Sequence, residues 1–387
     1  MIKRTAEDKL IRLHNSFKIV AVTGPRQAGK TTLVKKAFPE MAYVNLENPD
    51  IRYFSMDDPR GFLSQYPDGA ILDEVQHNPG LFSYLQEIVD NSTEKGQFIL
   101  TGSNNFLLNE KISQTLAGRV AYLNLLPFSL KEVQVKFAAK NENEYLLQGF
   151  YPPIYDQEIP YSEWIQNYIR TYIERDVRQI KNITDLFVFE RFMRLLAGRI
   201  GQELNYSSLS VEVGVDVKTI QSWIGILESS FIIFLLKPYY KNFNKTIVKR
   251  PKLYFYDSAI ACSLLQLKRY NHIISHPLRG ALFESFVMSE VIKKQVNEDN
   301  DFRLYYWRDK TGREVDIILD TPLETIPVEI KSGKTIQQEF FKNVRYWMKL
   351  SGVKNGKVIY AGDTTQNRSE GIEIFGWREI HDKLGDI

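Results

Sequence analysis

One short segment limits what this chain of 387 residues can fold into: Gly24-Pro-Arg-Gln-Ala-Gly29-Lys30-Thr31. It lies between an apolar, strand-like run at 18–23 and a helix-like stretch at 31–38. The spacing of Gly, four residues and Gly-Lys-Thr allows the backbone to curl so that successive N–H groups converge on phosphate oxygens. The amino end of the following helix adds partial positive charge. We therefore expect a loop that binds the phosphates of a nucleotide.

The loop combines backbone that surrounds phosphate with two side chains that have specific roles. Lys30 would reach the β- and γ-phosphates, and Thr31 would place its hydroxyl on Mg²⁺. The expected nucleotide-binding residues are Gly24, Pro25, Arg26, Gln27, Ala28, Gly29, Lys30, Thr31 and Thr32.

An apolar run that ends in two adjacent acids follows the loop. Residues 70–74 read Ala-Ile-Leu-Asp-Glu, so a buried strand would deliver Asp73 at its carboxyl end. Asp73 would hold Mg²⁺ through water, and Glu74 would act as the general base for an attacking water. The adjacent acids favour hydrolysis of a nucleotide over transfer of its phosphate to another nucleotide. An acidic pair that only caps a strand end is the alternative.

Two further positions are candidates for contact with the γ-phosphate. The apolar run 97–101 leads into small polar residues, of which Ser103 or Asn104 would sense the γ-phosphate; a polar turn is the alternative. Arg119 is a candidate arginine finger, because a guanidinium suits the charge that builds on the γ-phosphate oxygens. The sequence does not decide whether Arg119 acts in its own subunit or in a neighbouring one. A structural salt bridge is the other role open to Arg119.

Together these motifs resemble a prokaryotic family of AAA-type ATPases whose C-terminal region is described only as a domain of unknown function. The resemblance rests on residues 23–32, Leu72-Asp-Glu-Val-Gln76, Leu100-Thr-Gly-Ser103 and Leu116-Ala-Gly-Arg119, and it continues at 172–176, 251–257 and 307–331. It implies a bacterial or archaeal source and an ATP-binding fold. In P-loop ATPases with the additional strand, the strand corresponding to 97–101 lies between the strand of the loop and that of the acidic pair.

Strand-like and helix-like stretches alternate up to residue 130, which predicts a parallel sheet covered on both faces. A Pro-rich segment at 150–160 breaks this rhythm. We therefore expect an α/β fold with an AAA-like P-loop ATPase domain at 1–150, a helical winged-helix domain at 151–270 and a PD-(D/E)xK nuclease-like α/β domain at 271–387.

The middle region has the pattern of a winged helix. Residues 204–228 read as a helix-turn-helix with Gly214 at the turn, and apolar runs at 231–236 and 252–256 would form the wing. The connector Lys237–Lys252 contains six basic residues and no acidic one, so we expect it to contact DNA phosphates. The polar residues of the second helix would enter a groove, namely Lys218, Thr219, Gln221 and Ser222. A packing or protein-interaction module is the alternative.

An acidic constellation marks the C-terminal region. Glu284 would lie on a helix, Asp316 on a strand, and Glu329 with Lys331 on one face of the next strand, since strand side chains repeat every two residues. This arrangement resembles the PD-(D/E)xK nuclease fold. Asp316 and Glu329 would then hold a divalent metal ion near Glu284, and Lys331 would orient the hydrolytic water. A nuclease-like fold kept as an inert interaction module is the alternative.

Composition excludes several classes of protein. The single cysteine, Cys262, allows no intrachain disulfide and no cysteine-based zinc site. The longest aliphatic-aromatic run, 231–236, is too short to span a bilayer, and the charged amino terminus does not resemble a signal peptide, so we expect no membrane association and a cytoplasmic location. A net charge of +3 means that any nucleic-acid contact must be local.

The sequence predicts a Mg²⁺-dependent ATPase that acts as a nucleotide-driven switch on nucleic acid, with ATP and Mg²⁺ as cofactors. Two other hypotheses remain open at this point. One is an ATP-gated signalling or scaffold protein whose winged helix binds a protein and whose nuclease-like fold is inert. The other is an ATP-regulated, metal-dependent nuclease. A homo-oligomer is compatible with the sequence, which does not decide it.

Overall fold

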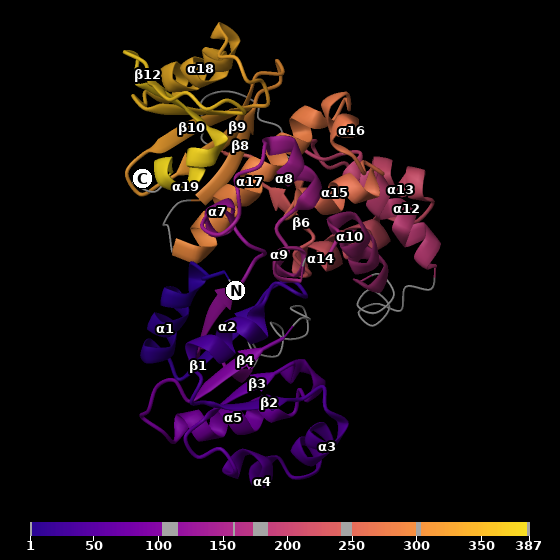
Figure 1. Ribbon diagram of the computed structural model, residues 1–387, viewed down its shortest axis with the longest axis vertical. Coiled ribbons are helices and arrows are strands. Elements are labelled where there is room, and N and C mark those ends of the chain that lie inside the picture. The colour runs from indigo at the N-terminus through magenta and orange to yellow at the C-terminus, as the bar shows by residue number, and fades with distance from the viewer. Residues whose placement is uncertain are drawn as a thin grey trace.

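The computed structural model describes residues 2–102, 115–157, 159–172, 185–240, 250–298 and 303–384. Figure 1 shows a first sheet with its helices at one end of the molecule and the helical and second-sheet elements at the other. Among the described helices, none is both long and apolar enough to cross a lipid bilayer.

The first sheet has five parallel strands in the order β2-β3-β4-β1-β5. The order places β4 between β1, which leads into the glycine-rich loop, and β3, which ends in the acidic pair. This confirms the predicted P-loop fold with an additional strand. The strands are β1 (Ile19–Thr23), β2 (Ala42–Asn45), β3 (Ala70–Asp73), β4 (Phe98–Thr101) and β5 (Val120–Asn124).

Helices cover both faces of this sheet, as the buried and mainly apolar central strands β1, β3 and β4 require. Successive residues of β1 point to opposite faces: Val20 and Val22 pack with α1 and α2, whereas Ile19 and Ala21 pack with α4 and α5. The elements around the sheet are α1 (Ala6–Ser16), α2 (Lys30–Ala37), α3 (Pro49–Asp57), α4 (Pro59–Ser64), the 3₁₀ turn η1 (Val75–His77) and α5 (Leu81–Asp90).

The middle region is mainly helical and contains one hairpin. Helices α13 and α14 meet at Gly214, whose φ of +83° closes α13 in the left-handed region that glycine favours. Strands β6 and β7 then pair antiparallel. Its elements are α7 (Leu130–Gln134), α8 (Glu142–Gln148), α9 (Pro152–Asp156), α10 (Tyr161–Thr171), α12 (Leu186–Ala197), α13 (Tyr206–Val213), α14 (Val217–Ser229), β6 (Ile233–Leu236), β7 (Lys252–Phe255), α15 (Ser258–Leu264) and α16 (Tyr270–Ile274). Identification of this region as a winged helix stays a prediction.

The C-terminal region is built on a mixed six-stranded sheet in the order β12-β13-β11-β10-β9-β8. Strands β8, β9 and β10 pair antiparallel, and β11 pairs parallel to β10. Helices α17 and α18 pack on opposite faces. Its elements are α17 (Arg279–Glu298), β8 (Arg303–Arg308), β9 (Glu314–Asp320), β10 (Thr325–Lys331), η3 (Gln338–Phe341), α18 (Lys342–Ser351), β11 (Gly356–Tyr360), β12 (Gln366–Asn367), β13 (Ile372–Gly376), η4 (Trp377–Glu379) and α19 (Ile380–Lys383).

The hydrophobic cores do not follow the expected boundary near residue 150. Helices α7 and α8 belong to the core that the middle and C-terminal regions share, and Phe150 stacks on Phe286 of α17 at a centroid distance of 5.7 Å. The core of the first sheet extends only to Leu125 in this direction. Packing therefore changes soon after β5, about 25 residues before the Pro-rich segment that the sequence suggested.

A buried carboxylate joins helix α7 of the middle region to the C-terminal region. Glu290 of α17 accepts hydrogen bonds from the Leu130 amide (2.7 Å), from Lys293 Nζ (2.7 Å) and from His381 Nε2 (2.8 Å). Burial alone raises the pKa of Glu290, but Lys293 and His381 lower it by more, so the pKa is about 2. The carboxylate is thus charged and fully partnered although it is inaccessible to solvent.

Substitution Glu290→Gln removes this charge and leaves Lys293 buried without its counter-ion. We expect a loss of about 3 kcal/mol in the free energy of unfolding at pH 7, measured by urea denaturation. Because the folded-state pKa lies below the ordinary value, the contribution is present above about pH 4.5 and disappears as the pH falls toward 2. The stability difference between wild type and variant should therefore shrink between pH 5 and pH 3. A difference that is small or constant over this range would contradict the assignment.

Candidate active site

The glycine-rich loop has the backbone that its sequence predicts. Gly24 has a φ of +145°, and a Cβ there would lie 2.1 Å from the carbonyl oxygen of Leu125. Gly29 has a φ of +91° and stands directly before the first residue of α2. Glycine is required at both positions, at the first by a close approach of two backbones and at the second by a left-handed conformation.

Lys30 points into the curl of the loop. Its side chain is 7% exposed, and Nζ donates to the carbonyl oxygens of Gly24 (3.0 Å) and Pro25 (2.8 Å). The ammonium group therefore lies inside the ring of backbone that would surround a phosphate.

Asp73, at the end of β3, connects the loop with the two neighbouring strands β2 and β4. Its Oδ2 atom accepts hydrogen bonds from Thr31 Oγ1 (3.0 Å) and from the Tyr43 hydroxyl (2.6 Å), and its Oδ1 atom accepts from Thr101. Burial and the bond to Asp73 raise the pKa of Tyr43, so this hydroxyl remains a donor. Sequence reasoning missed Tyr43 and Thr101, although parallel strands that end at one sheet edge are a signal that could have indicated them.

The residues around Asp73 fit a magnesium ion. Mg²⁺ prefers oxygen ligands and is usually held by one or two protein groups together with nucleotide phosphates and water. Thr31 and Asp73 present a hydroxyl and a carboxylate at hydrogen-bond distance from each other, at the amino end of α2. Among the described residues there is no group of three His, Cys, Asp or Glu side chains that could hold a metal ion alone. A site completed by phosphate oxygens needs no such group.

Glu74 has an unusual backbone conformation. Its φ of +54° lies in the left-handed region, which a glutamate adopts at a cost of about 1–3 kcal/mol. Its carboxylate accepts a hydrogen bond from Gln76, and the residue lines the same cavity as the loop. The strained backbone aims an acid at the space next to Lys30 and Thr31.

A cavity of about 810 Å³ lies over the loop and has two walls. The first sheet supplies one wall, and helices α9 and α10 with the segment between them supply the other. The residues of the second wall, which sequence reasoning missed, are Pro152, Pro153, Asp156, Gln157, Ile159, Trp164, Asn167, Tyr168, Thr171 and Tyr172. These residues are more than 100 positions away from the glycine-rich loop in the sequence. No local sequence pattern predicts that they approach it.

Arg4 ties the glycine-rich loop to helix α7. Its buried guanidinium donates to the carbonyl oxygens of Ala28 in the loop (2.8 Å) and Leu126 (2.6 Å), and it pairs with Glu132 of α7 (3.2 Å). Sequence reasoning treated the amino terminus only as a charged stretch, so it missed this support of the loop.

The structure bears differently on the two positions that were predicted to contact the γ-phosphate. Ser103 and Asn104 lie outside the described residues. Arg119 precedes β5 and therefore lies at the amino edge of the sheet, opposite the loop, where it pairs with Asp90 (2.9 Å). A role for Arg119 in the active site of its own subunit is thus wrong, because the length of β1 separates the two. The salt bridge is the role that the structure shows, and an action in a neighbouring subunit stays a prediction.

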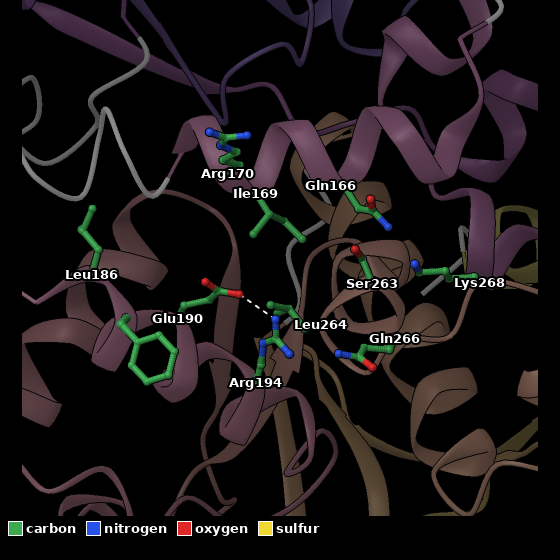
Figure 2. A pocket seen from close by; sticks show the side chains of 11 residues that line it. Gln166, Ile169, Arg170, Leu186, Glu190, Arg194, Ser263, Leu264, Gln266 and Lys268 are labelled. Atoms are coloured by element: carbon green, nitrogen blue, oxygen red, sulfur yellow. Dashed lines mark hydrogen bonds and ion pairs between the residues drawn. The ribbon is translucent and has the colours of Figure 1, made fainter.

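Another cavity, of about 620 Å³, lies on the far side of α10 (Figure 2). Gln166, Ile169 and Arg170 of α10 face α12 across it, where Glu190 and Arg194 form an ion pair at 2.7 Å. Helix α10 therefore stands between two cavities, with Asn167 and Thr171 on the side of the glycine-rich loop.

The structure brings the C-terminal constellation together and adds a residue that was not expected in it. Glu284 lies on α17, Asp316 on β9, and Glu329 with Lys331 on β10; Lys331 Nζ bonds Glu329 at 2.6 Å. Burial and the charges of Glu329 and Glu284 raise the pKa of Asp316 well above its ordinary value. Lys252, which begins β7, reaches Glu284 from the hairpin at 3.3 Å.

This position of Lys252 corrects the expected DNA-binding strip. Residues 241–249 of the strip lie outside the described residues. Lys252 is 2% exposed and bonds carboxylates inside the protein, so it is not available to a phosphate backbone. Lys237 remains exposed at the other end of the strip.

Three family models match successive parts of the chain. Residues 16–134 match an AAA domain, 139–271 match a domain of unknown function (DUF8612), and 279–380 match another domain of unknown function (DUF4143). The chain thus carries an AAA-type P-loop ATPase domain followed by a C-terminal domain of unknown function, as the resemblance implied.

Two curated relatives cover most of the chain. A protein of Mycobacterium tuberculosis is 29% identical over 86% of this chain and 74% of its own length. A protein of Methanocaldococcus jannaschii is 24% identical over 92% of this chain and 83% of its own length. Both are named only as uncharacterised proteins.

Similar solved structures include a Walker-type ATPase and a branch migration motor. A Walker-type ATPase of Pyrococcus abyssi is 14% identical, with a TM-score of 0.46 over 68% of this chain and 96% of that one. The RuvB Holliday junction branch migration motor of Thermotoga maritima is 16% identical, with a TM-score of 0.30 over 60% of this chain and 89% of that one. Because both scores are below 0.5, the fold assignment rests on the strand order and on the AAA domain match.

Substitution Lys30→Ala removes the ammonium group from the loop. We expect the affinity for ATP to fall about 10- to 100-fold or more, since hydrogen bonds to charged groups contribute about 1.5–3 kcal/mol each. Fluorescence titration with a labelled ATP analogue measures the change. Lys36→Ala is the matched control, because Lys36 lies on the same helix and pairs with Glu7 on the surface. Unchanged ATP affinity in Lys30→Ala would show that the site is misassigned.

Proposed function

We propose that the chain is a Mg²⁺-dependent ATP hydrolase whose active site is the cleft between the glycine-rich loop and helices α9 and α10. The observation that carries this proposal is the bond of Thr31 to Asp73 at 3.0 Å, with Glu74 facing the same cavity. Lys30 and Thr31 begin α2, and Asp73 and Glu74 lie at the carboxyl end of β3, so these side chains meet at one edge of the sheet. The AAA domain match supports nucleotide binding independently.

Each residue has a defined task in this reaction. The backbone N–H groups of residues 24–31 and Lys30 Nζ would bind the β- and γ-phosphates. Bound Mg²⁺, held by Thr31 and through water by Asp73, would neutralise charge on the phosphate oxygens. Glu74 would orient a water molecule and accept its proton while the oxygen of that water bonds to the γ-phosphorus and the bond to ADP breaks.

Substitution Glu74→Gln keeps the size of the side chain and removes its ability to accept a proton. We expect ATP binding to persist and ATP turnover, measured by phosphate release, to fall about 10²- to 10⁴-fold. Glu87→Gln on α5 is the control, because Glu87 pairs with Arg60 on the surface away from the cavity. Wild-type turnover in Glu74→Gln would refute the general-base role.

We propose further that the nucleotide state acts on the middle region through α10. One side of α10 lines the nucleotide cleft and the other lines the cavity of Figure 2. Trp164 and Tyr168 of α10 pack tightly on Tyr151, with ring centroids 4.9 and 4.8 Å apart from it. A packed helix of this kind moves as a unit, so closure around a nucleotide would change the shape of both cavities.

Nucleic acid is the partner that we propose for this switch, through the middle region interpreted as a winged helix. The order of α13, α14 and the β6–β7 hairpin supports that interpretation, and α14 exposes Lys218 and Gln221. Phosphate contacts by a few exposed cations would give binding that depends on salt and little on sequence.

ATP turnover measured with and without single- and double-stranded DNA tests this partner. We expect stimulation that weakens as the salt concentration rises, because binding releases counterions from the DNA. Lys218→Ala should weaken the stimulation, whereas Lys342→Ala on the C-terminal α18 should not. Absence of stimulation by either form of DNA would reject nucleic acid and favour the scaffold alternative, in which the middle region binds a protein.

A further inference from the structure

The acidic cluster of the C-terminal region contains a cation supplied by another part of the chain. Lys252 comes from the β6–β7 hairpin of the middle region and not from the C-terminal sheet. Its side chain is 2% exposed, and Nζ donates to Glu284 Oε1 at 3.3 Å and to Glu314. The ammonium group thus lies between α17 and β9, the two elements that carry Glu284 and Asp316.

The hairpin holds Lys252 in place from both sides. The Tyr254 hydroxyl, two residues further along β7, donates to Glu284, and the Phe255 amide donates to Ser285 Oγ at 3.1 Å. On the strand opposite, the Tyr239 amide donates to the Tyr306 carbonyl at 2.7 Å, so the chain after β6 pairs with the edge strand β8. Lys252 is therefore part of a continuous junction and is not a mobile surface side chain.

The charges favour a lysine that remains protonated. Burial lowers the pKa of Lys252, but Tyr254 and the carboxylates of Glu284, Glu314 and Asp316 raise it by more, and the net pKa lies well above its ordinary value. An ammonium ion among these carboxylates repels a divalent cation at the same place. A buried lysine and a metal ion are thus competing ways to neutralise this cluster.

The carboxylate oxygens are also engaged by the protein itself. Asp316 Oδ2 accepts from the Ile330 amide at 2.7 Å, and Glu329 Oε1 accepts from Lys331 (2.6 Å) and Asn343 (3.1 Å). Across the described residues no three acidic or histidine side chains are placed to share a metal ion. The predicted ligands Asp316 and Glu329 are thus neighbours, and the protein itself bonds one carboxylate oxygen of each.

We propose that Lys252 is a fixed internal counter-ion that takes the place of a divalent metal ion in the acidic cluster. The nuclease-like region then serves as a docking partner of the hairpin and does not cleave nucleic acid. The cluster keeps a latent capacity for a metal ion, since Glu329 Oε2 is buried and makes no hydrogen bond among the described residues. This inference is independent of the proposed ATPase activity.

The proposal is tested by titrating the nucleotide-free protein with Mn²⁺. Electron paramagnetic resonance measures the concentration of free Mn²⁺ at each step. We expect wild type and Asp316→Asn to bind Mn²⁺ alike. In Lys252→Met the affinity should rise about 100-fold or more, because a charge that opposes the metal ion has been removed. Adding Asp316→Asn to Lys252→Met should abolish that gain. Lys334→Met is the control, since Lys334 is an exposed lysine that pairs with the buried carboxylate of Glu142 and not with the acidic cluster.

Two results would overturn the proposal. One is Mn²⁺ binding by the wild-type chain that Asp316→Asn removes, and the other is Mn²⁺-dependent cleavage of DNA by wild type that Asp316→Asn removes. Both comparisons need only wild type and Asp316→Asn. That variant removes one negative charge from a cluster of carboxylates. The two comparisons therefore decide the question even if Lys252→Met does not fold.

Discussion

The arrangement of this molecule depends on one buried carboxylate. Glu290 has no exposure to solvent, and its charge persists because a backbone amide, a lysine and a histidine from three separate segments converge on it. Removing Lys293 or His381 takes away one of the two cations that compensate this buried charge, and breaking a buried ion pair costs far more than a surface ion pair contributes. The bond to Leu130 fixes α7 on α17 only a few residues after the last strand of the first sheet. Helices α9 and α10, which supply the second wall of the cavity over the loop, follow α7 in the chain.

Within the cleft, the carboxylate of Asp73 likewise joins several segments of the chain through hydrogen bonds. It receives hydroxyl groups from the loop, from β2 and from β4, so the position of Thr31 is coupled to the positions of two neighbouring strands. Arg4 supports the loop from the opposite side by bonding the Ala28 carbonyl and pairing with Glu132 of α7. A change in the loop on nucleotide binding would therefore reach both the sheet and the middle region, as a switch requires.

Charged residues in this chain often neutralise one another instead of facing a ligand. Arg119 pairs with Asp90, and Lys252 pairs with Glu284 and Glu314. Each was a functional candidate from sequence, Arg119 as an arginine finger and Lys252 as part of a basic strip expected to contact DNA. Burial and the identity of the partner separate the two cases, and both are properties of the folded chain.

The local parts of this structure were predictable from sequence for a physical reason. The apolar run of residues predicts strand β3. The loop at Gly24 and Gly29 and the turn at Gly214 follow from backbone angles that glycine alone adopts easily. Both kinds of signal act over a few residues. The place of β4 between β1 and β3 was implied by the resemblance to P-loop ATPases with an additional strand. No local sequence pattern indicated three other features of the structure. These are the cavity wall that contains Trp164 and Tyr168, the bond of Arg4 to the loop, and the position of Lys252 in a distant acidic cluster. Those contacts join segments far apart in the chain, and only the packing of a shared core determines which of them meet.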